Sequence, residues 1–306
     1  MHSNNPHNNG YDMQALAQAL PELAPYLIHN KYDRLTINFS DNNAVKLLNK
    51  ALLKLEYGLL DWDIPDGYLC PPIPGRVDYL HHLQDYLVQH HYFSVNKKTP
   101  KTVTALDIGT GANVIYPLLA SRAFGWNVIA SDIDDGALIS AQENINKNAS
   151  LDMAISLRKQ HSNEHIFKGI IQKEDYFDVT ICNPPFHESE QAALKGSVRK
   201  NKNLSRNKQK RASNVKAVSQ DESLNFAGQS NELWCEGGEK RFIKNMIRES
   251  KLFSKQVGCF TCLVSKKETL APIIQLLKKA SAKFDVIEMA QGNKVSRFIA
   301  WHFIQD

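Results

Sequence analysis

The chain has 306 residues, of which 42% are hydrophobic and 23% charged, and its formal net charge is +5. This length allows one large α/β domain with an appendage, and this composition excludes disorder along most of the chain. Residues 1–12 are polar and lack the apolar core of a secretory signal, and no stretch reaches the roughly 18 uninterrupted apolar residues of a membrane span. We therefore expect a cytoplasmic protein with no membrane partner and with a flexible tail over residues 1–12.

Ahead of the main domain, residues 13–75 form a predicted helical region. Apolar residues recur at helical spacing over 13–31, and a clearer helix over 41–57 has Asp41 as its cap. Prolines and glycines over 59–75 predict an irregular connection, so we place the domain boundary after residue 75. One face of the clearer helix carries three lysines, which either meet phosphate or form a solvated surface: Lys46, Lys50 and Lys54.

Residues 76–306 have the pattern of one α/β domain. After a helix at 76–91, buried strands alternate with helices, which requires right-handed crossovers and predicts a doubly wound, mostly parallel sheet. The last two strands have no helix between them and predict an antiparallel pair at the carboxyl end. The predicted strands are 102–108, 126–132, 155–157, 178–183, 258–265, 284–290 and 297–304, and a further helix covers 272–280.

The cysteines and paired histidines do not indicate a metal site. The five cysteines are scattered and odd in number, which is typical of reduced thiols. Cys259 and Cys262 form a CxxC pattern inside a predicted strand, where residues three apart face opposite sides of the sheet. The histidine pairs at 81–82 and 90–91 lack carboxylate or cysteine partners at suitable spacing. We predict that the protein holds no metal.

A glycine turn follows the first strand of the predicted sheet, where doubly wound sheets place their ligands. Gly109, Thr110 and Gly111 form a GxG pattern with no third glycine two residues later. That pattern fits a nucleoside ligand without a pyrophosphate, such as S-adenosylmethionine, better than a dinucleotide. Asp132, at the end of the next strand, is placed to accept hydrogen bonds from two ribose hydroxyls. Asp107 is expected to hold the turn or, through water, the ammonium group of the ligand.

The fourth strand ends abruptly in Asn183, Pro184, Pro185 and Phe186, because proline cannot donate to a sheet ladder. Such a turn can hold a planar group with an exocyclic amine. The Asn183 side-chain oxygen and the Pro184 carbonyl would accept the two N–H groups and aim the nitrogen lone pair at a methyl donor. Phe186 would stack on the base, and Pro185 would stiffen the turn. Catalysis of this kind depends on positioning and aligned dipoles and needs no strong general base.

Beyond this turn, residues 187–231 form a predicted flexible, basic insert. The segment has few large apolar side chains, and no acid occurs between Glu190 and Asp221. Its position beside the catalytic turn favours contact with an RNA backbone over a merely solvated segment. Its cations are Lys195, Arg199, Lys200, Lys202, Arg206, Lys208, Lys210, Arg211 and Lys216.

Together these motifs produce a family resemblance that extends from Arg34 onward. The chain resembles the bacterial adenine-N6 methyltransferases of large-subunit (23S) ribosomal RNA, the RlmF type, and the related eukaryotic methyltransferase-like enzymes that form N6-methyladenosine in RNA. The motifs that carry the resemblance are Arg76-Val77-Asp78-Tyr79, Asp107-Ile108-Gly109-Thr110-Gly111-Ala112, Asp132-Ile133-Asp134-Asp135, Asn183-Pro184-Pro185-Phe186 and Glu236-Gly237-Gly238-Glu239.

The resemblance implies a class I methyltransferase fold of the Rossmann-like type, with S-adenosylmethionine as the cofactor. It implies that Arg76 contacts the cofactor carboxylate, that Gly109 lines the cofactor pocket, and that Asp132, where some relatives have glutamate, binds the ribose. The 183–186 turn would hold the adenine, and the helical region 13–75 would bind RNA. The implied partner is 23S ribosomal RNA or a large-subunit assembly intermediate, and the sequence does not indicate an oligomer.

Two other functions remain open at this point. Release-factor methyltransferases, which modify a glutamine side-chain amide, share Asn-Pro-Pro but usually continue with tyrosine, so Phe186 and the basic insert favour nucleic acid. A noncatalytic RNA-binding factor in ribosome assembly could also retain the cofactor fold. Methyl transfer by the protein distinguishes the enzyme from this factor.

Overall fold

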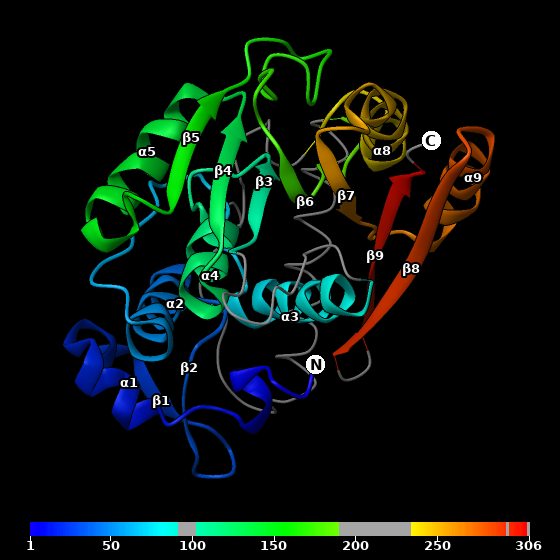
Figure 1. The fold of residues 1–306 in the computed structure, drawn as a ribbon. Helices are drawn as coiled ribbons and strands as arrows, with labels where there is room; N and C mark the ends of the chain where they lie inside the picture. Colours follow the sequence, from blue (N-terminus) through cyan, green and yellow to red (C-terminus); the bar gives the residue numbers. More distant parts are fainter. Residues whose placement is uncertain (91–101, 190–233, 292–293, 305–306) are drawn as a thin grey trace.

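A seven-stranded sheet forms the centre of the molecule in the computed structural model, which describes residues 1–90, 102–189, 234–291 and 294–304 (Figure 1). The strand order is β5-β4-β3-β6-β7-β9-β8, in which β3 to β7 are parallel and the last two strands are antiparallel. The predicted α/β fold with an antiparallel strand pair at its end is confirmed. The strands are β3 (Thr104–Ile108), β4 (Asn127–Asp132), β5 (Ile155–Lys159), β6 (Phe177–Cys182), β7 (Val257–Leu263), β8 (Ala282–Gln291) and β9 (Lys294–Phe303).

The order of the strands creates a crevice beside β3. The chain passes from β3 to β4 and β5 on one side, and then returns to β6 on the other side of β3. In this register Ile108 pairs with both Ser131 and Cys182, so β3, β4 and β6 end side by side. The loops after β3 and β6 leave neighbouring strands and run in different directions. Doubly wound sheets bind their ligands in the crevice between two such loops.

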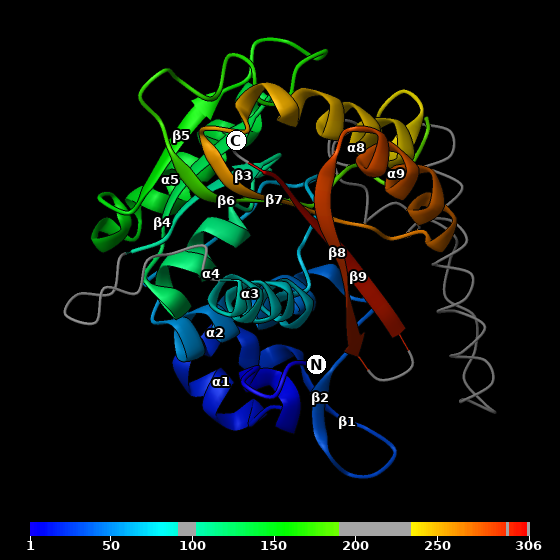
Figure 2. The ribbon, with the colours of Figure 1, turned by 45° about the vertical axis from the view of Figure 1, so that its right-hand side comes forward.

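Helices cover both faces of the sheet (Figures 1 and 2). Cys259 packs in the core of one face and Cys262 in the core of the other, which confirms that the CxxC residues point in opposite directions. Among the described residues, no helix is long and apolar enough to cross a membrane. The first face is covered by α3 (Ile73–Gln89), α4 (Ile115–Phe124) and α5 (Asp135–Asn146), and the second by α8 (Gly238–Ser250) and α9 (Lys267–Lys279).

The N-terminal region has its own small core, formed by α1 (Met13–Ala19), the 3-10 turn Pro21–Tyr26 and α2 (Asn42–Tyr57). Asp41 caps α2 as predicted, because its carboxylate accepts the Asn43 and Ala44 N–H groups. A hairpin of β1 (Leu27–His29) and β2 (Leu35–Ile37) was not predicted, since strands of three residues carry almost no periodic signal.

Two expectations for this region need correction. The boundary placed after residue 75 falls inside the first turn of α3, which begins at Ile73. The lysine face of α2 is also partly occupied, because Lys46 pairs with Asp63 at 3.0 Å and Lys50 pairs with Asp61 at 2.5 Å. Both carboxylates come from the irregular connection after α2. This connection therefore neutralises two of the three lysines considered for phosphate contact.

Residues 1–12, predicted to be a flexible tail, instead pack against α2 and α3. Asn5 is buried and donates from Nδ2 to Asp78 Oδ1 at 3.0 Å. His7 is buried too and shares a hydrogen bond of 2.9 Å with the Tyr57 hydroxyl. Burial, together with the neighbouring His81, lowers the pKa of His7 to about 4. The composition suggested a solvated tail, but these polar side chains find partners far along the chain.

Asn148 ties the irregular connection to the end of α5. Its side chain is buried, accepts the Leu60 N–H at 2.7 Å and donates to the Asp61 carbonyl at 2.7 Å. Because backbone groups that are partly shielded from water need hydrogen-bond partners, this one side chain stabilises a stretch that has no regular structure of its own.

We predict that Asn148→Ala lowers the free energy of unfolding by about 2 kcal/mol, because the part-buried Leu60 N–H and Asp61 carbonyl and the buried Asn144 carbonyl lose a partner. Urea denaturation measures this loss. Asn146→Ala is the matched control, since Asn146 is exposed on the same segment and should change stability by less than about 0.5 kcal/mol. Equal stabilities of the two variants would contradict the prediction.

Candidate active site

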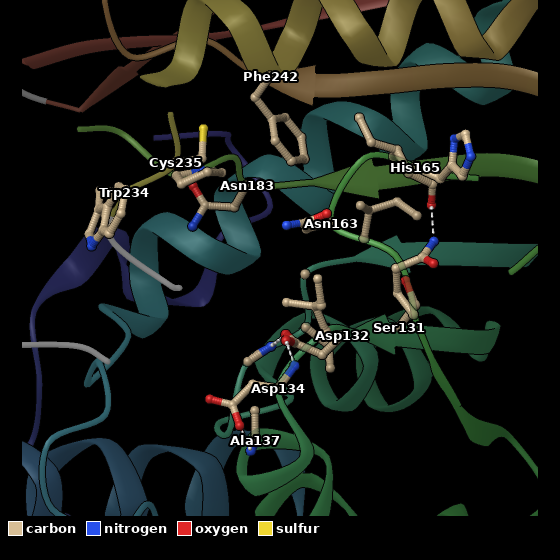
Figure 3. A pocket seen from close by; sticks show the side chains of 18 of the residues that line it. Ser131, Asp132, Asp134, Ala137, Asn163, His165, Asn183, Trp234, Cys235 and Phe242 are labelled. Carbon is tan, nitrogen blue, oxygen red and sulfur yellow. Dashed lines mark hydrogen bonds between the residues drawn. The ribbon is translucent and has the colours of Figure 1, made fainter. Parts of the chain in front are cut away.

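A cavity of about 740 Å³ lies at the carboxyl ends of β3, β4 and β6 (Figure 3). Its walls come from the loops after these strands, from the loop after β5 and from the first turns of α8. Seven of the predicted site residues line it: Arg76, Gly109, Thr110, Gly111, Asp132, Asn183 and Pro185. The fold thus brings the glycine turn and the proline turn, which are far apart in sequence, to one cavity.

The glycine turn, residues 109–111, is held by the neighbouring strand. The N–H groups of Gly109 and Thr110 both donate to the Ser131 carbonyl at 2.9 Å. Gly109 and Gly111 have φ angles of 72° and 64°, in the left-handed region that favours glycine. A Cβ on Gly109 would meet no described atom within 4 Å, so the space above the turn is open to a ligand.

Asp132 holds the glycine turn, which was one of the two roles predicted for Asp107. Its carboxylate accepts the Gly111 N–H at 2.8 Å and the Asp134 N–H at 2.9 Å, so it holds the glycine turn (Figure 3). Burial raises the pKa of Asp132, and these N–H groups oppose that rise. Each carboxylate oxygen has a second lone pair, so Asp132 retains acceptor capacity toward the cavity that it lines.

Asp107 lies buried behind the glycine turn and is 1% exposed. Neither of its carboxylate oxygens has a hydrogen-bond partner among the described residues. Burial raises the pKa of Asp107 to about 7, and the charge of Asp132 adds to the rise, while the nearby Thr110 hydroxyl and the Arg76 charge oppose it. A buried carboxyl group without a partner is a position that a cation or a donor would stabilise.

Arg76 supplies a cation at the same end of the cavity. It belongs to the first turn of α3, donates from Nη1 to the Tyr116 hydroxyl at 2.9 Å, and lies 5.5 Å from the centre of that ring. Its Nε is buried and has no partner in the part of the chain that the structure describes. Arg76 is thus oriented by Tyr116 and has a donor left for an anionic group.

Asn183 is the first residue after β6, and its side chain lines the cavity. Its Oδ1 is buried and accepts no hydrogen bond from the described residues, so an acceptor is available at this end of the cavity. Pro185 also lines the cavity, whereas the buried Pro184 and the half-buried Phe186 do not. The structure therefore brings Asn183 to the site as predicted but does not place the Phe186 ring in the cavity wall.

Two parts of the wall were missed by the sequence analysis. One is the loop after β5, which includes Asn163 and His165, and the other is the start of α8, which includes Phe242. Figure 3 shows Phe242 pointing from α8 into the cavity, near Asn183 and Asn163. The loop is polar and without periodicity, and α8 opens with two glycines, so neither carried a usable local signal.

Glu249 anchors the loop after β5 from the far end of α8. Its carboxylate accepts three successive N–H groups of that loop, at 2.8 Å from Ile166, 3.0 Å from Phe167 and 2.6 Å from Lys168. A carboxylate bound by three N–H groups is well satisfied. The loop wall is thereby held in place by a residue from a distant part of the chain.

The histidine and cysteine residues considered for a metal, and the basic insert expected to contact RNA, belong to other parts of the chain. In the described ranges, no cluster of three or more histidine, cysteine, aspartate or glutamate side chains is arranged to hold a metal ion. His82 lies 3.9 Å from Asp78 Oδ2, and the His81 ring stacks on His2. The basic insert predicted at 187–231 lies outside the described residues from position 190 onward.

Comparisons with known proteins agree over nearly the whole chain. A family model described as RNA methyltransferase matches residues 1–305. The ribosomal RNA large subunit methyltransferase F of Shewanella loihica is 51% identical over 315 residues, which cover 99% of this chain and 79% of that protein. The protein of the same name from Colwellia psychrerythraea is 50% identical over 305 residues and 99% of each chain.

Solved structures of human METTL16 share the fold. Its catalytic domain in complex with MAT2A 3′UTR hairpin 6 matches with a TM-score of 0.77 and 29% identity, covering 100% of this chain and 98% of that chain. Its N-terminal domain in complex with SAH matches with a TM-score of 0.75 and 26% identity, covering 100% and 99%. The similarity therefore extends beyond the sheet to the whole described arrangement.

We predict that Asp107 makes stability depend on pH. Its pKa rises from 3.8 to about 7 on folding, so the folded state binds the extra proton between these values, and the free energy of unfolding falls as pH rises from about 4 to 7. The loss is at most about 4 kcal/mol, and Asp107→Asn should not show it. Urea denaturation of both proteins without ligand at several pH values measures the difference. A stability difference that is independent of pH would contradict the prediction.

Proposed function

The chain belongs to the RNA methyltransferase family whose model spans residues 1–305, and we propose that it transfers a methyl group from S-adenosylmethionine to N6 of a specific adenine in 23S ribosomal RNA. The observation that supports the choice of an exocyclic amine is the buried Oδ1 of Asn183 at the cavity, which has no hydrogen-bond partner among the described residues and is followed by two prolines. The names of the relatives support ribosomal RNA of the large subunit as the substrate.

The residues at the other end of the cavity fit the cofactor. Its amino-acid part carries an ammonium and a carboxylate. The Asp107 carboxyl and the Arg76 Nε, which are buried and have no hydrogen-bond partner among the described residues, belong to groups of the complementary charge. The ammonium would favour the ionised form of Asp107. Asp132 would accept from the ribose hydroxyls with its remaining lone pairs, and the glycine turn lets the backbone approach closely. When bound, the cofactor supplies an electrophilic sulfonium methyl group.

Asn183 and Pro184 would orient the amine of the target base. The Asn183 Oδ1 and the Pro184 carbonyl accept the two N–H groups, which directs the nitrogen lone pair toward the methyl donor. The proton becomes acidic once nitrogen has formed its new bond, so solvent can take it and no strong base is required. The base must first be unstacked from the RNA to reach this cavity.

Two surfaces would hold the rest of the RNA. The cations between residues 195 and 216 provide backbone contacts beside the catalytic turn. The tip of the β1–β2 hairpin exposes Lys31, Tyr32 and Arg34, with the Lys31 ammonium 4.6 Å from the centre of the Tyr32 ring. Exposed aromatic rings beside cations are suited to single-stranded nucleic acid.

We predict that Asn183→Ala lowers methyl transfer by about 100-fold or more, since a dipole aligned with the reacting group is lost. Affinities for SAH and for RNA should change less than about 3-fold. Transfer of labelled methyl to 23S ribosomal RNA fragments, calorimetry and filter binding measure the three quantities. Asn146→Ala is the control, because Asn146 is exposed and remote from the cavity lining.

Mass mapping of N6-methyladenosine in ribosomal RNA tests the proposed function itself. Cells without this protein should lack one modification, which the parent protein restores and the Asn183→Ala variant does not. Identical maps with and without the protein, or no transfer by the parent protein to RNA, would overturn the proposal. RNA binding without any methyl transfer would favour the noncatalytic assembly factor.

We predict that deletion of residues 195–216 weakens RNA binding and flattens its dependence on salt, because fewer counterions are then released. The affinity for SAH should stay the same, since the deletion removes none of the described residues that line the cavity. Binding titrations across a range of salt concentrations give the slope directly. An unchanged slope would exclude the segment from RNA contact.

A further inference from the structure

The motif Glu236-Gly237-Gly238-Glu239 has no role in the function described so far, although it opens α8 beside the cavity. Gly238 is buried and has a φ of +59°. A Cβ at this position would lie 2.8 Å from Cγ of Glu188 and 3.3 Å from its Cα and N. Glu188 follows Phe186 by two residues, so the chain leaving the 183–186 turn passes close over the start of α8. A side chain at position 238 would force Glu188 to shift, and the positive φ adds backbone strain for any residue other than glycine.

A backbone contact joins the same two segments. The Cys235 N–H donates to the His187 carbonyl at 3.1 Å, and His187 forms an isolated parallel bridge with Trp234. Both contacts lie between the catalytic turn and Gly238. The exit of the turn is therefore bound along its length to the segment that leads into α8.

Glu239 fixes the start of α8 to the start of the neighbouring helix α9. It is 1% exposed, and its carboxylate accepts the Ser265 N–H, the Lys266 N–H at 3.3 Å and the Thr269 hydroxyl at 3.0 Å. These groups begin α9, directly after β7, where unpaired N–H groups favour a negative charge. Because β7 pairs with β6, the contacts form a closed ring around the carboxyl end of β6.

The same helix turn also carries part of the cavity wall. Phe242 follows Glu239 by three residues and points into the cavity near Asn183 (Figure 3). A shift at the start of α8 would thus displace the 183–186 turn and the wall facing it together. Misplacement of reacting groups by about 1 Å can lower a rate about 100-fold.

We propose that Gly238 and Glu239 are positioning residues, which hold Asn183 in the geometry needed for methyl transfer. This inference rests on the proposed function above. Gly238 lets the exit of the turn approach α8, and Glu239 keeps α8 from moving away from the sheet. Neither residue contacts the reacting atoms, so their effect falls on the rate of transfer and not on the binding of cofactor or RNA.

The variant Gly238→Ala tests the proposal. The kcat of RNA methylation should fall at least about 10-fold, while the SAH affinity, the SAH binding stoichiometry and the KM for RNA stay within about 2-fold. Gly125→Ala is the matched control for backbone strain, because Gly125 has a φ of +68° and its Cβ would meet no described atom within 4 Å. This control should keep the parent kcat.

A second substitution distinguishes positioning from general damage. Adding Glu188→Ala to Gly238→Ala removes the Cγ atom at 2.8 Å and should restore at least about a third of the lost rate. An unchanged kcat in Gly238→Ala, or a loss matched by a lower SAH stoichiometry, would overturn the proposal. If Gly238→Ala does not fold, Glu239→Gln is tested in the same assays. An unchanged kcat in Glu239→Gln rejects the proposal. A parent protein without transfer activity rejects the proposed function instead.

Discussion

The end of β6 is the constraint on which the site depends. Pro184 has no N–H to continue the ladder, so the strand stops at Cys182 and the Asn183 side chain reaches the cavity. A strand that stops in this way leaves a turn without ladder partners of its own. The next residues along the chain hold the turn instead, through the His187 carbonyl and the close contact of Glu188 with α8.

The opposite end of the cavity depends on two aspartates with different roles. Asp132 uses its carboxylate to hold the glycine turn, so its charge is satisfied within the protein. Asp107 has no such partner among the described residues, and burial raises its pKa to about 7. Folding therefore leaves one carboxyl group in an unfavourable environment. A bound ligand, rather than folding, would supply the hydrogen-bond partners of the Asp107 carboxyl group and of the Arg76 Nε.

The cavity wall is completed by residues far from both turns. Glu239 and Glu249 lie near the two ends of α8, and each carboxylate is satisfied by backbone N–H groups of another segment. Glu239 anchors α8 to the start of α9, and Glu249 anchors the loop after β5 to α8. A single helix thus joins the wall next to Asn183 to the loop that contains Asn163.

Local patterns in the sequence determined the strands of the seven-stranded sheet, the glycine turn and the stop at Pro184, because period, backbone freedom and a missing N–H act within a few residues. They also predicted that Asp132 and Asn183 lie at one site, since parallel strands end at the same edge of a sheet, whereas Arg76 of α3 was expected there only from the family resemblance. Only the tertiary structure decided which aspartate holds the turn, that residues 1–12 are packed, and that α8 supplies a wall. These features are contacts between side chains and distant backbone, and no local period encodes such pairings.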